Sequence, residues 1–349
     1  MNRLGVSIVI CCHNSSSRLP KTLAYLKDQK TPSDLLWEVI IVDNASADGT
    51  GEKAQSIWDQ KSDIPFKVVE EPKPGLMNAR FKGFESSHYE FVSFIDDDNW
   101  LADDWVKTVF KKMIQYPNAG AIGGQSIAVF ETKPPNWFDK YKGWYAVGKP
   151  LDLDGKPIER ECKLPEGKLL WGAGLTIRKS AWQGLLDRGV KPVLSGRKGK
   201  KLSSGEDLEL CIMLLLSGWD LYFSPELIFS HFITENRLSW KYLCKLNQAN
   251  GQCRLYLDHY ENFFPFKYKE NTFEENWKDG IYKDIKYVFY RPKRLIQSLL
   301  YMRESDSKIL LMYKVIGRLT ERLRLLKKIQ NIQSEIEQQA KSLLDLSNN

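Results

Sequence analysis

The sequence predicts an α/β protein whose mostly parallel sheet is covered by helices on both faces. In the first half, short apolar runs alternate with segments in which apolar residues recur every three or four positions, as expected of strands alternating with helices. The 349 residues are 42% hydrophobic and 27% charged, which is typical of a globular protein with a sizeable core. Because crossovers between parallel strands are right-handed, this order favours a doubly wound, Rossmann-like sheet.

Four predicted strands in the first half are each followed by a predicted helix. The first helix places Leu19, Leu23 and Leu26 on one face, tolerates Pro20 in its first turn, and is ended by Thr31-Pro32-Ser33. The predicted strands cover residues 6–12, 37–42, 66–70 and 89–95, and the predicted helices cover 18–29, 50–60, 76–85 and 103–116.

The pattern is less regular after a fifth predicted strand. A segment rich in proline and aromatic residues follows it and could form either the rim of a substrate site or an ordinary long connection. A basic, glycine-containing segment further on could close on phosphates or remain a solvated loop. The fifth strand covers 122–129, the aromatic segment 131–167 and the basic segment 196–202; further strands are predicted at 169–177, 219–223 and 228–232, and a helix at 208–216. Ser180 is expected to cap a short helix, and Ser204 to cap the helix at 208–216 with Asp207 three residues on.

From about residue 238 the chain is predicted to be helical, basic and amphipathic. Residues 283–330 hold 13 Lys/Arg and 4 Asp/Glu, whereas the net charge of the whole chain is +7. These helices could lie on an anionic membrane, form a coiled-coil dimer, or cover the α/β domain. The predicted apolar stripe consists of Ile316, Leu319, Leu323, Leu326, Ile329, Ile332 and Ile336.

The cysteines and the N-terminus indicate a cytoplasmic protein. The six cysteines form no C-x-x-C pair, so we expect reduced thiols rather than a disulfide framework or a zinc site. The apolar run at 6–12 is too short for a signal peptide, and no apolar run approaches the roughly 20 residues that span a bilayer. Peripheral contact with the inner face of the cell membrane is the expected alternative.

Three consecutive carboxylates, Asp96, Asp97 and Asp98, end the apolar strand at 89–95. Ligands of open α/β sheets lie at the carboxyl ends of the strands, and Mg²⁺ and Mn²⁺ prefer oxygen ligands such as carboxylates and phosphates. The triplet therefore suits a metal that carries a phosphorylated ligand. The alternative is a solvated acidic turn, in which Asp98 or Asn99 caps the next helix.

Further polar residues stand at the ends of other elements. Asp43 and Asn44 follow the second strand, Glu206 and Asp207 precede a helix, and His231 lies in a late strand. The chain lacks both G-x-G-x-x-G after the first strand and G-x-x-x-x-G-K-[ST], which argues against a dehydrogenase and against a P-loop enzyme.

Five segments, in this order, resemble the successive motifs of the family 2 glycosyltransferases. They are Val6-Ser7-Ile8-Val9-Ile10, Val42-Asp43-Asn44-Ala45-Ser46-Ala47-Asp48-Gly49-Thr50, Gly75-Leu76-Met77-Asn78-Ala79-Arg80, Phe94-Ile95-Asp96-Asp97-Asp98 and Gly205-Glu206-Asp207. The resemblance covers about residues 5–235. It implies the GT-A fold, a nucleotide-diphosphate sugar as donor, Mn²⁺ or Mg²⁺ as cofactor, and transfer that inverts the anomeric centre.

The resemblance also implies a division of the chain and roles for single residues. Residues 1–130 would bind the nucleotide-sugar and 131–235 the acceptor, followed by a helical C-terminal extension at 236–349. The implied nucleotide-sugar residues are Asp43, Asn44, Arg80, Asp96 and Asp97; the implied metal ligands are Asp98, Asp96 and His231; and the implied catalytic base is Asp207, with Glu206 beside it. Asn44 stands where many members have Asp. Taken alone, Glu206 and Asp207 could be helix caps, His231 a buried structural histidine, and Arg80 an exposed helix arginine.

The expected function is therefore metal-dependent inverting sugar transfer. A UDP-sugar is the favoured donor, and a glycan or lipid-linked glycan of bacterial polysaccharide assembly is the expected acceptor, with no nucleic acid as partner. One alternative is an inactive GT-A-like binding module, which the intact acidic motifs argue against. The other is a nucleotidyltransferase, although the chain lacks the glycine-rich N-terminal loop that such enzymes use.

Overall fold

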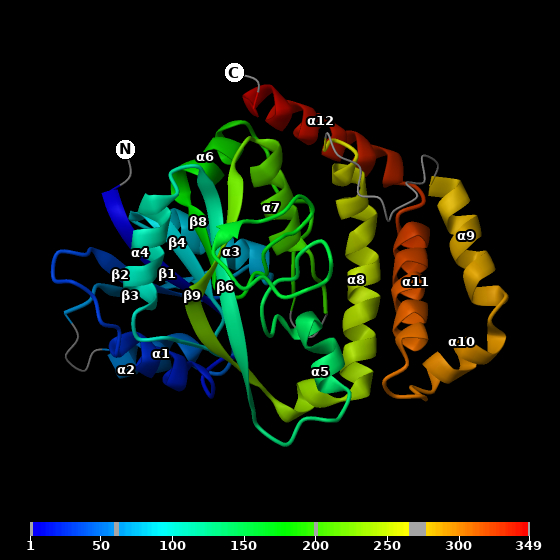
Figure 1. Cartoon of the computed structure of the whole chain (residues 1–349), viewed down its shortest axis with the longest axis horizontal. Coiled ribbons are helices and arrows are strands. Elements are labelled where there is room, and N and C mark those ends of the chain that lie inside the picture. Colours follow the sequence, from blue (N-terminus) through cyan, green and yellow to red (C-terminus); the bar gives the residue numbers. More distant parts are fainter. Residues whose placement is uncertain (1–2, 59–62, 199–201, 265–276, 348–349) are drawn as a thin grey trace.

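The computed structural model describes residues 3–58, 63–198, 202–264 and 277–347. The strands are β1 (Arg3–Cys12), β2 (Trp37–Asp43), β3 (Phe66–Glu70), β4 (Tyr89–Ile95), β5 (Asn99–Leu101), β6 (Ala119–Phe130), β7 (Cys162–Lys163), β8 (Leu175–Arg178) and β9 (Asp220–Ile233). Within the described ranges they form one sheet in the order β3-β2-β1-β4-β8-β6-β9-β5, with β7 paired to β9. Helices lie around this sheet (Figure 1), so the predicted fold class is confirmed.

The first half of the sheet is parallel, as predicted. Strands β1, β2, β3 and β4 pair in parallel, and the strands predicted at 66–70 and 89–95 have those bounds. The helices that follow these strands are α1 (Leu19–Lys27), α2 (Thr50–Trp58), α3 (Leu76–Ser86) and, after β5, α4 (Trp105–Gln115). The last two positions of the helix predicted at 50–60 lie outside the described residues.

Alternation along the buried strands explains why helices cover both faces. Successive side chains of a strand point to opposite faces. Ile8 and Ile10 of β1 pack in a core with residues of α1, α2 and α4. Val9, between them, packs in a second core with residues of α3, α6 (Lys179–Asp187) and α7 (Glu206–Leu216). The apolar run of each central strand thus supplies two cores at once.

The second half of the sheet is mixed. Strand β8 is antiparallel to β4 and to β6, and β6 is parallel to β9. The strand predicted at 169–177 is shorter than expected, because only its end pairs in the sheet. The two strands predicted around Pro225 are one strand, β9, whose register against β6 shifts between Gly123 and Gln125. The shift in register accommodates Pro225, because a proline lacks the N–H that a regular ladder of hydrogen bonds requires.

Two predicted helix caps are wrong. Helix α7 begins after Gly205, which has a φ of 97° and caps no N–H through a side chain; the Ser204 hydroxyl lies 3.4 Å from Asn250 Oδ1 instead. Ser180 lies inside α6, and its hydroxyl donates to the Glu90 carboxylate. Both serines have a tertiary partner, which replaces the local capping interaction.

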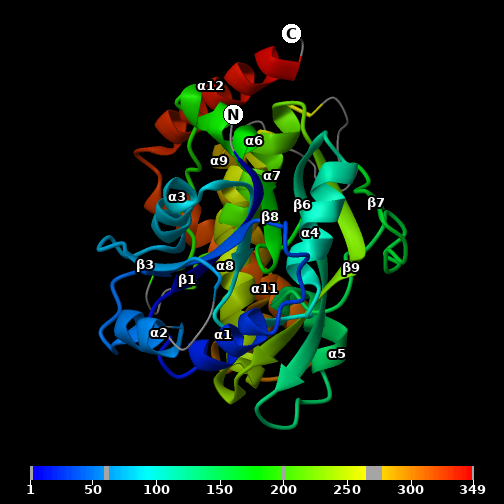
Figure 2. The same cartoon turned by 90° about the vertical axis from the view of Figure 1, so that its left-hand side faces the viewer.

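The C-terminal extension is helical, as predicted, and consists of α8 (Trp240–Glu261), α9 (Trp277–Phe289), α10 (Pro292–Leu299), α11 (Ser307–Arg324) and α12 (Ile329–Ser347). The predicted apolar stripe is not one continuous seam. The turn between α11 and α12 leaves Leu323 and Leu326 exposed. Ile336 and Ala340 of α12, in contrast, are buried in the same core as α7, and α12 lies beside α6 and α7 in both views (Figures 1 and 2). Of the three expected placements, packing on the α/β domain therefore accounts for α12.

Helices α8 and α11 pack with their backbones in close contact. A Cβ atom added to Gly251 of α8 would lie 2.0 Å from the Lys314 carbonyl oxygen, and one added to Gly317 of α11 would lie 2.0 Å from the Gln248 carbonyl oxygen. Each glycine thus leaves room for the backbone of the opposite helix. Because both contacted atoms belong to the backbone, rotation of a side chain cannot relieve either contact.

We expect Gly251→Ala and Gly317→Ala each to lower the free energy of unfolding by about 1–3 kcal/mol, because the added methyl group overpacks the interface. This loss from overpacking should exceed the gain of about 1 kcal/mol that alanine provides over glycine through its higher helix propensity. Gly184→Ala is the matched control, since a Cβ there meets no atom within 4 Å. Urea denaturation measures the difference. Equal stability of all three variants would contradict this account of the interface.

Candidate active site

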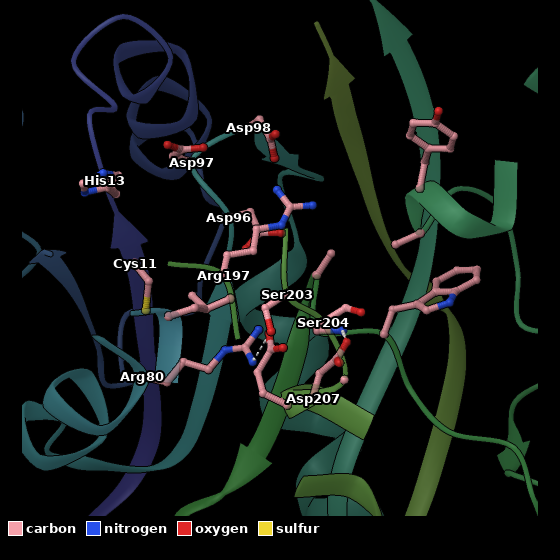
Figure 3. A pocket seen from close by; sticks show the side chains of 18 of the residues that line it. Cys11, His13, Arg80, Asp96, Asp97, Asp98, Arg197, Ser203, Ser204 and Asp207 are labelled. Atoms are coloured by element: carbon pink, nitrogen blue, oxygen red, sulfur yellow. Dashed lines mark hydrogen bonds and ion pairs between the residues drawn. The ribbon is translucent and has the colours of Figure 1, made fainter. Parts of the chain in front are cut away.

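A cavity of about 500 Å³ opens at the carboxyl ends of β1, β2 and β4 (Figure 3). Cavities of this size bind small molecules, and this edge of an open α/β sheet is where ligands bind. Of the predicted site residues, it is lined by Asn44, Arg80, Asp96, Asp97, Asp98, Glu206, Asp207 and His231. The fold thus brings together segments that lie more than 180 residues apart in the sequence.

Asp97 is held by residues of α1 and of the turn just before it. Arg18 donates to both of its carboxylate oxygens, through Nη2 at 2.6 Å and Nε at 3.2 Å, and the Ser15 hydroxyl donates to Oδ2. Thr22 donates to the Asp97 carbonyl at 2.7 Å. Asp97 therefore anchors the acidic turn to α1.

Asp98 lies beside Asp97 but has different partners, because β9 brings His231 next to it. The β5–β9 pairing sets Asn99 opposite His231, and the His231 Nε2 atom lies 3.5 Å from Asp98 Oδ1. Arg237 donates through Nη1 to Asp98 Oδ2 at 2.9 Å and lies 3.2 Å from His231 Nε2. Burial and the nearby Arg237 lower the pKa of His231 to about 3, so its imidazole is neutral.

The acids of this turn are strained by burial and mutual repulsion. Burial raises the pKa of Asp98 to about 6 even though Arg237 opposes the shift. The pKa of Asp96 is also raised, first by burial and then by Asp98. A cation at this point would therefore stabilise both carboxylates.

The donor atoms of this turn fit a divalent cation that is shared with a phosphorylated ligand. In the described part of the chain, no group of three or more His, Cys, Asp or Glu side chains is arranged to hold a metal by itself. Mg²⁺ in proteins typically takes one or two carboxylates and completes its shell with substrate phosphates and water. The Asp98 carboxylate, with Asp96 nearby, meets that requirement. The Arg237 guanidinium lies 2.9 Å from Asp98 Oδ2 and 3.2 Å from His231 Nε2, so it would have to move for Asp98 and His231 to share one cation.

Arg80 and Glu206 form a buried ion pair on the other side of the cavity. Arg80 Nη1 lies 3.1 Å from Glu206 Oε1, and both side chains are less than 10% exposed. Burial and the neighbouring Asp207 raise the pKa of Glu206 to about 7, although Arg80 opposes the shift. The view that Arg80 is an exposed helix arginine is therefore wrong.

Asp207 is partly exposed to the cavity in the first turn of α7. Its Oδ2 accepts a hydrogen bond of 2.7 Å from the Gly172 N–H, and its Oδ1 accepts one of 2.9 Å from the Leu208 N–H. Two backbone groups thus fix the orientation of the carboxylate. Figure 3 shows Asp207 on the opposite side of the cavity from Asp97 and Asp98, with Arg197 between them.

Asp43 and Asn44 have structural partners at the end of β2. Asp43 is not among the residues that line the cavity; its carboxylate accepts from the backbone N–H groups of Ser46 and Gly51. The Asn44 amide donates to the carbonyls of Glu71 and Lys73 and accepts from the Gly75 N–H. An aspartate could not donate to those two carbonyls, which gives a physical reason for asparagine at this position.

The basic segment predicted at 196–202 contributes Arg197 to the cavity; residues 199–201 lie outside the described residues. The backbone of this segment is bound to α3, because Leu76 N–H donates to the Arg197 carbonyl and Met77 N–H donates to the Ser195 carbonyl. The Glu209 carboxylate holds the preceding residues by accepting from two further N–H groups. Within its described part, the segment is thus a positioned wall of the cavity.

The aromatic segment predicted at 131–167 supplies the rim, which supports the first of its two interpretations. Trp144 and Tyr145 line the cavity, and Trp144 is 40% exposed. The Tyr145 hydroxyl donates to the Arg237 carbonyl at 3.0 Å, so this rim also supports the arginine beside Asp98.

Sequence reasoning missed Arg18 and Arg237. Each belongs to no recognised motif and reaches its aspartate only through the fold. A basic residue shortly after His231 is a weak signal that could have drawn attention to Arg237. The sequence marks Arg197 only as one of several basic residues in a glycine-containing loop.

Comparison with known proteins identifies the family of the chain. The family model for glycosyl transferase family 2 matches residues 7–172. The "Putative teichuronic acid biosynthesis glycosyltransferase TuaG" of Bacillus subtilis is 32% identical over 241 residues, which are 68% of this chain and 83% of that protein. The "Putative glycosyltransferase EpsH" of Bacillus subtilis is 32% identical over 111 residues, which are 32% of this chain but only 31% of that protein.

A solved structure shares the fold. The crystal structure of GalNAc-T7 with UDP, GalNAc and Mn²⁺ aligns with 75% of this chain and 49% of its own, at a TM-score of 0.51 and 16% identity. The family match and the extent of the similarity to TuaG carry the assignment. The chain therefore belongs to glycosyl transferase family 2 and has the GT-A fold that its motifs predict.

Proposed function

We propose that this protein transfers a sugar from a nucleotide-diphosphate sugar, with a UDP-sugar favoured, to an acceptor hydroxyl with inversion at the anomeric carbon. One observation carries the proposal: a cavity at the carboxyl ends of the strands holds the Asp98–His231 pair on one side and Asp207 on the other. In this proposal residues 1–130 bind the donor, 131–235 bind the acceptor, and 236–349 form the helical extension.

Asp207 acts as the general base. An acceptor hydroxyl has a very high pKa, so it must lose its proton as it attacks, and a positioned carboxylate accepts that proton. The new C–O bond forms on the face opposite the diphosphate while the bond to the diphosphate breaks. This single displacement inverts the anomeric centre and leaves no covalent intermediate. The backbone N–H groups of Gly172 and Leu208 keep the Asp207 carboxylate aimed into the cavity.

Asp98 and His231, with Asp96 nearby, would hold Mn²⁺ or Mg²⁺, which supplies positive charge for the leaving diphosphate when bound. The arginines of this chain add charge to the same region. Arg197 lies between the acidic turn and Asp207 (Figure 3), and Arg237 contacts Asp98. Fixed positive groups of this kind stabilise charge that develops on a leaving group.

The acceptor is proposed to be a glycan or a lipid-linked glycan of polysaccharide assembly. Two observations support this choice. The half-exposed Trp144 at the rim offers an aromatic face to an approaching sugar, and the name of the TuaG relative refers to teichuronic acid biosynthesis. The six free cysteines are those expected in a reducing compartment, so we place the reaction in the cytoplasm.

Donor binding tests this function. We expect one UDP-sugar to raise the Tm by several degrees in the presence of Mn²⁺, because saturation at 100 times Kd adds about 2.7 kcal/mol of stability. Chelation by EDTA should remove most of the shift, and Asp98→Asn should do the same. Asp103→Asn is the matched control, since that carboxylate is exposed and pairs with Lys30 at the surface.

Two outcomes would contradict the proposal. Stabilisation by nucleoside triphosphates but by no nucleotide-sugar, together with pyrophosphate release, would indicate a nucleotidyltransferase instead. An equal Tm shift in the wild type and in Asp98→Asn would show that Asp98 does not contribute to donor binding.

A further inference from the structure

An exposed apolar surface covers the outer side of α9 and α10. Of the nineteen large apolar side chains exposed in the described part of the chain, eight fall between residues 282 and 302. Isolated exposed apolar residues are ordinary, whereas a contiguous patch indicates a binding surface. We define the α9–α10 surface by Tyr282, Ile285, Phe289, Tyr290, Ile296, Leu299, Leu300 and Met302.

The spacing of the α9 members places them on one stripe. Tyr282, Ile285 and Phe289 recur at helical intervals and form the outward stripe of α9, while Gly280, Asp284 and Val288 form its buried side. Phe289 is 76% exposed and Leu299, on α10, is 65% exposed. Figure 1 shows both helices on the outer side of α11, at the edge of the molecule away from β2 and β3.

The charge around this patch is positive. Residues 277–303 contain seven Lys/Arg and two Asp/Glu. One of the two acids, Asp284, is 1% exposed and forms ion pairs with Arg318 and Arg322, so Asp279 is the acid of this segment that faces solvent. Some of the basic groups lie over aromatic rings, as Lys286 does over Tyr290 and Arg291 over Tyr287.

The loop that follows α10 contacts the segment that leads into the rim of the cavity. The loop after α10 is bound to α5 (Phe138–Tyr141), because Lys140 and Tyr141 both donate to the Ser305 carbonyl, at 3.0 and 2.9 Å. Helix α5 continues directly into the segment with Trp144 and Tyr145, which lines the cavity.

We propose that the α9–α10 surface binds the headgroup region of an anionic lipid bilayer. Helices that lie in a membrane interface combine aromatic and aliphatic side chains with surrounding Lys and Arg, and each basic residue adds about 1 kcal/mol of attraction to an anionic leaflet. A second copy of this chain is a poorer occupant, since two such faces would oppose like charges. No helix in the described ranges is long and apolar enough to cross a bilayer, so the contact is peripheral.

Vesicle flotation of the full chain tests the proposal. We expect flotation with phosphatidylcholine vesicles that contain phosphatidylglycerol, and at least about tenfold weaker binding to phosphatidylcholine alone. Phe289→Ser/Leu299→Ser and Lys286→Glu/Lys293→Glu should each weaken binding by about tenfold or more, the second because each basic residue contributes roughly fivefold. Leu151→Ser/Leu153→Ser is the matched control, since these side chains are 47% and 71% exposed elsewhere.

Three results would contradict the membrane proposal, and one of them would assign the surface to a second copy of the chain. Equal binding by the wild type and both double variants would overturn the proposal, as would equal binding to neutral and anionic vesicles. A dimer that Phe289→Ser/Leu299→Ser converts to a monomer, with no flotation, would assign the surface to a second copy. The thermal unfolding of each variant confirms that it is folded. Sugar transfer is measured separately on a soluble acceptor, so loss of flotation with intact transfer leaves the proposed function standing.

Discussion

Asp207→Asn is expected to reduce kcat for sugar transfer by about 10²–10⁴-fold, the usual contribution of a general base. The amide has no affinity for the acceptor proton, while it retains nearly the size and shape of the carboxylate. Donor binding should change little, because Asp207 lies across the cavity from the acidic turn (Figure 3). The measurements are initial rates at saturating donor and the Tm shift with donor and Mn²⁺.

The companion variant for this prediction is Glu206→Gln. Glu206 is buried against Arg80, so its replacement should affect stability more than proton transfer. If Glu206→Gln loses turnover while Asp207→Asn keeps the wild-type rate, the proton acceptor is Glu206. If neither variant nor the wild type turns over a donor that binds, the chain is a binding module.

Arg80→Met is expected to lower the free energy of unfolding by about 3–5 kcal/mol at pH 8, the cost of leaving one partner of a buried ion pair uncompensated. The cost should be smaller at pH 6. The pKa of Glu206 is about 7 in the folded protein, above the ordinary value, so below pH 7 this carboxyl is mostly protonated and needs no counter-charge. As the pH rises through 7, the wild type ionises Glu206 beside Arg80, whereas the variant cannot do so favourably.

Two controls isolate the ion pair. Arg80→Met/Glu206→Gln should recover much of the lost stability, because no buried charge then remains unpaired. Arg160→Met removes an exposed arginine and should change the stability by less than about 0.5 kcal/mol. Urea denaturation at pH 6 and pH 8 measures all three variants. A loss that is equal at both pH values and is not reduced in the double variant would show that the charges are not the cause.

The parts of the fold that depend on local pattern could be predicted from the sequence. Strands β3 and β4 have the predicted bounds, because a run of apolar residues between turn formers leaves few alternatives. The Asp96–Asp98 turn could be located for the same reason, since it follows a buried strand. The two serine caps could not, because the decision between a local cap and a tertiary partner depends on residues that are distant in sequence.

The arginines that pair with the aspartates of the site could not be predicted from the sequence for a related reason. Arg18 and Arg237 are 79 and 139 residues from the aspartates they contact, and the only local signal is the weak one of Arg237 shortly after His231. The exposed stripe of α9 was missed because an apolar helical period indicates a covered face by default. Only the placement of the neighbouring described helices shows that the α9 stripe is exposed.

The packing of α12 has a consequence for how the enzyme is made. Ile336, Ala340 and Leu343 are buried in the core that includes α7, and the first turn of α7 carries Asp207. During synthesis, the segment with Asp207 leaves the ribosome more than a hundred residues before α12 does. The helix that carries the proposed proton acceptor thus reaches its final packing only after residues 329–347 have emerged, so a ribosome-bound intermediate lacks part of the core that supports α7.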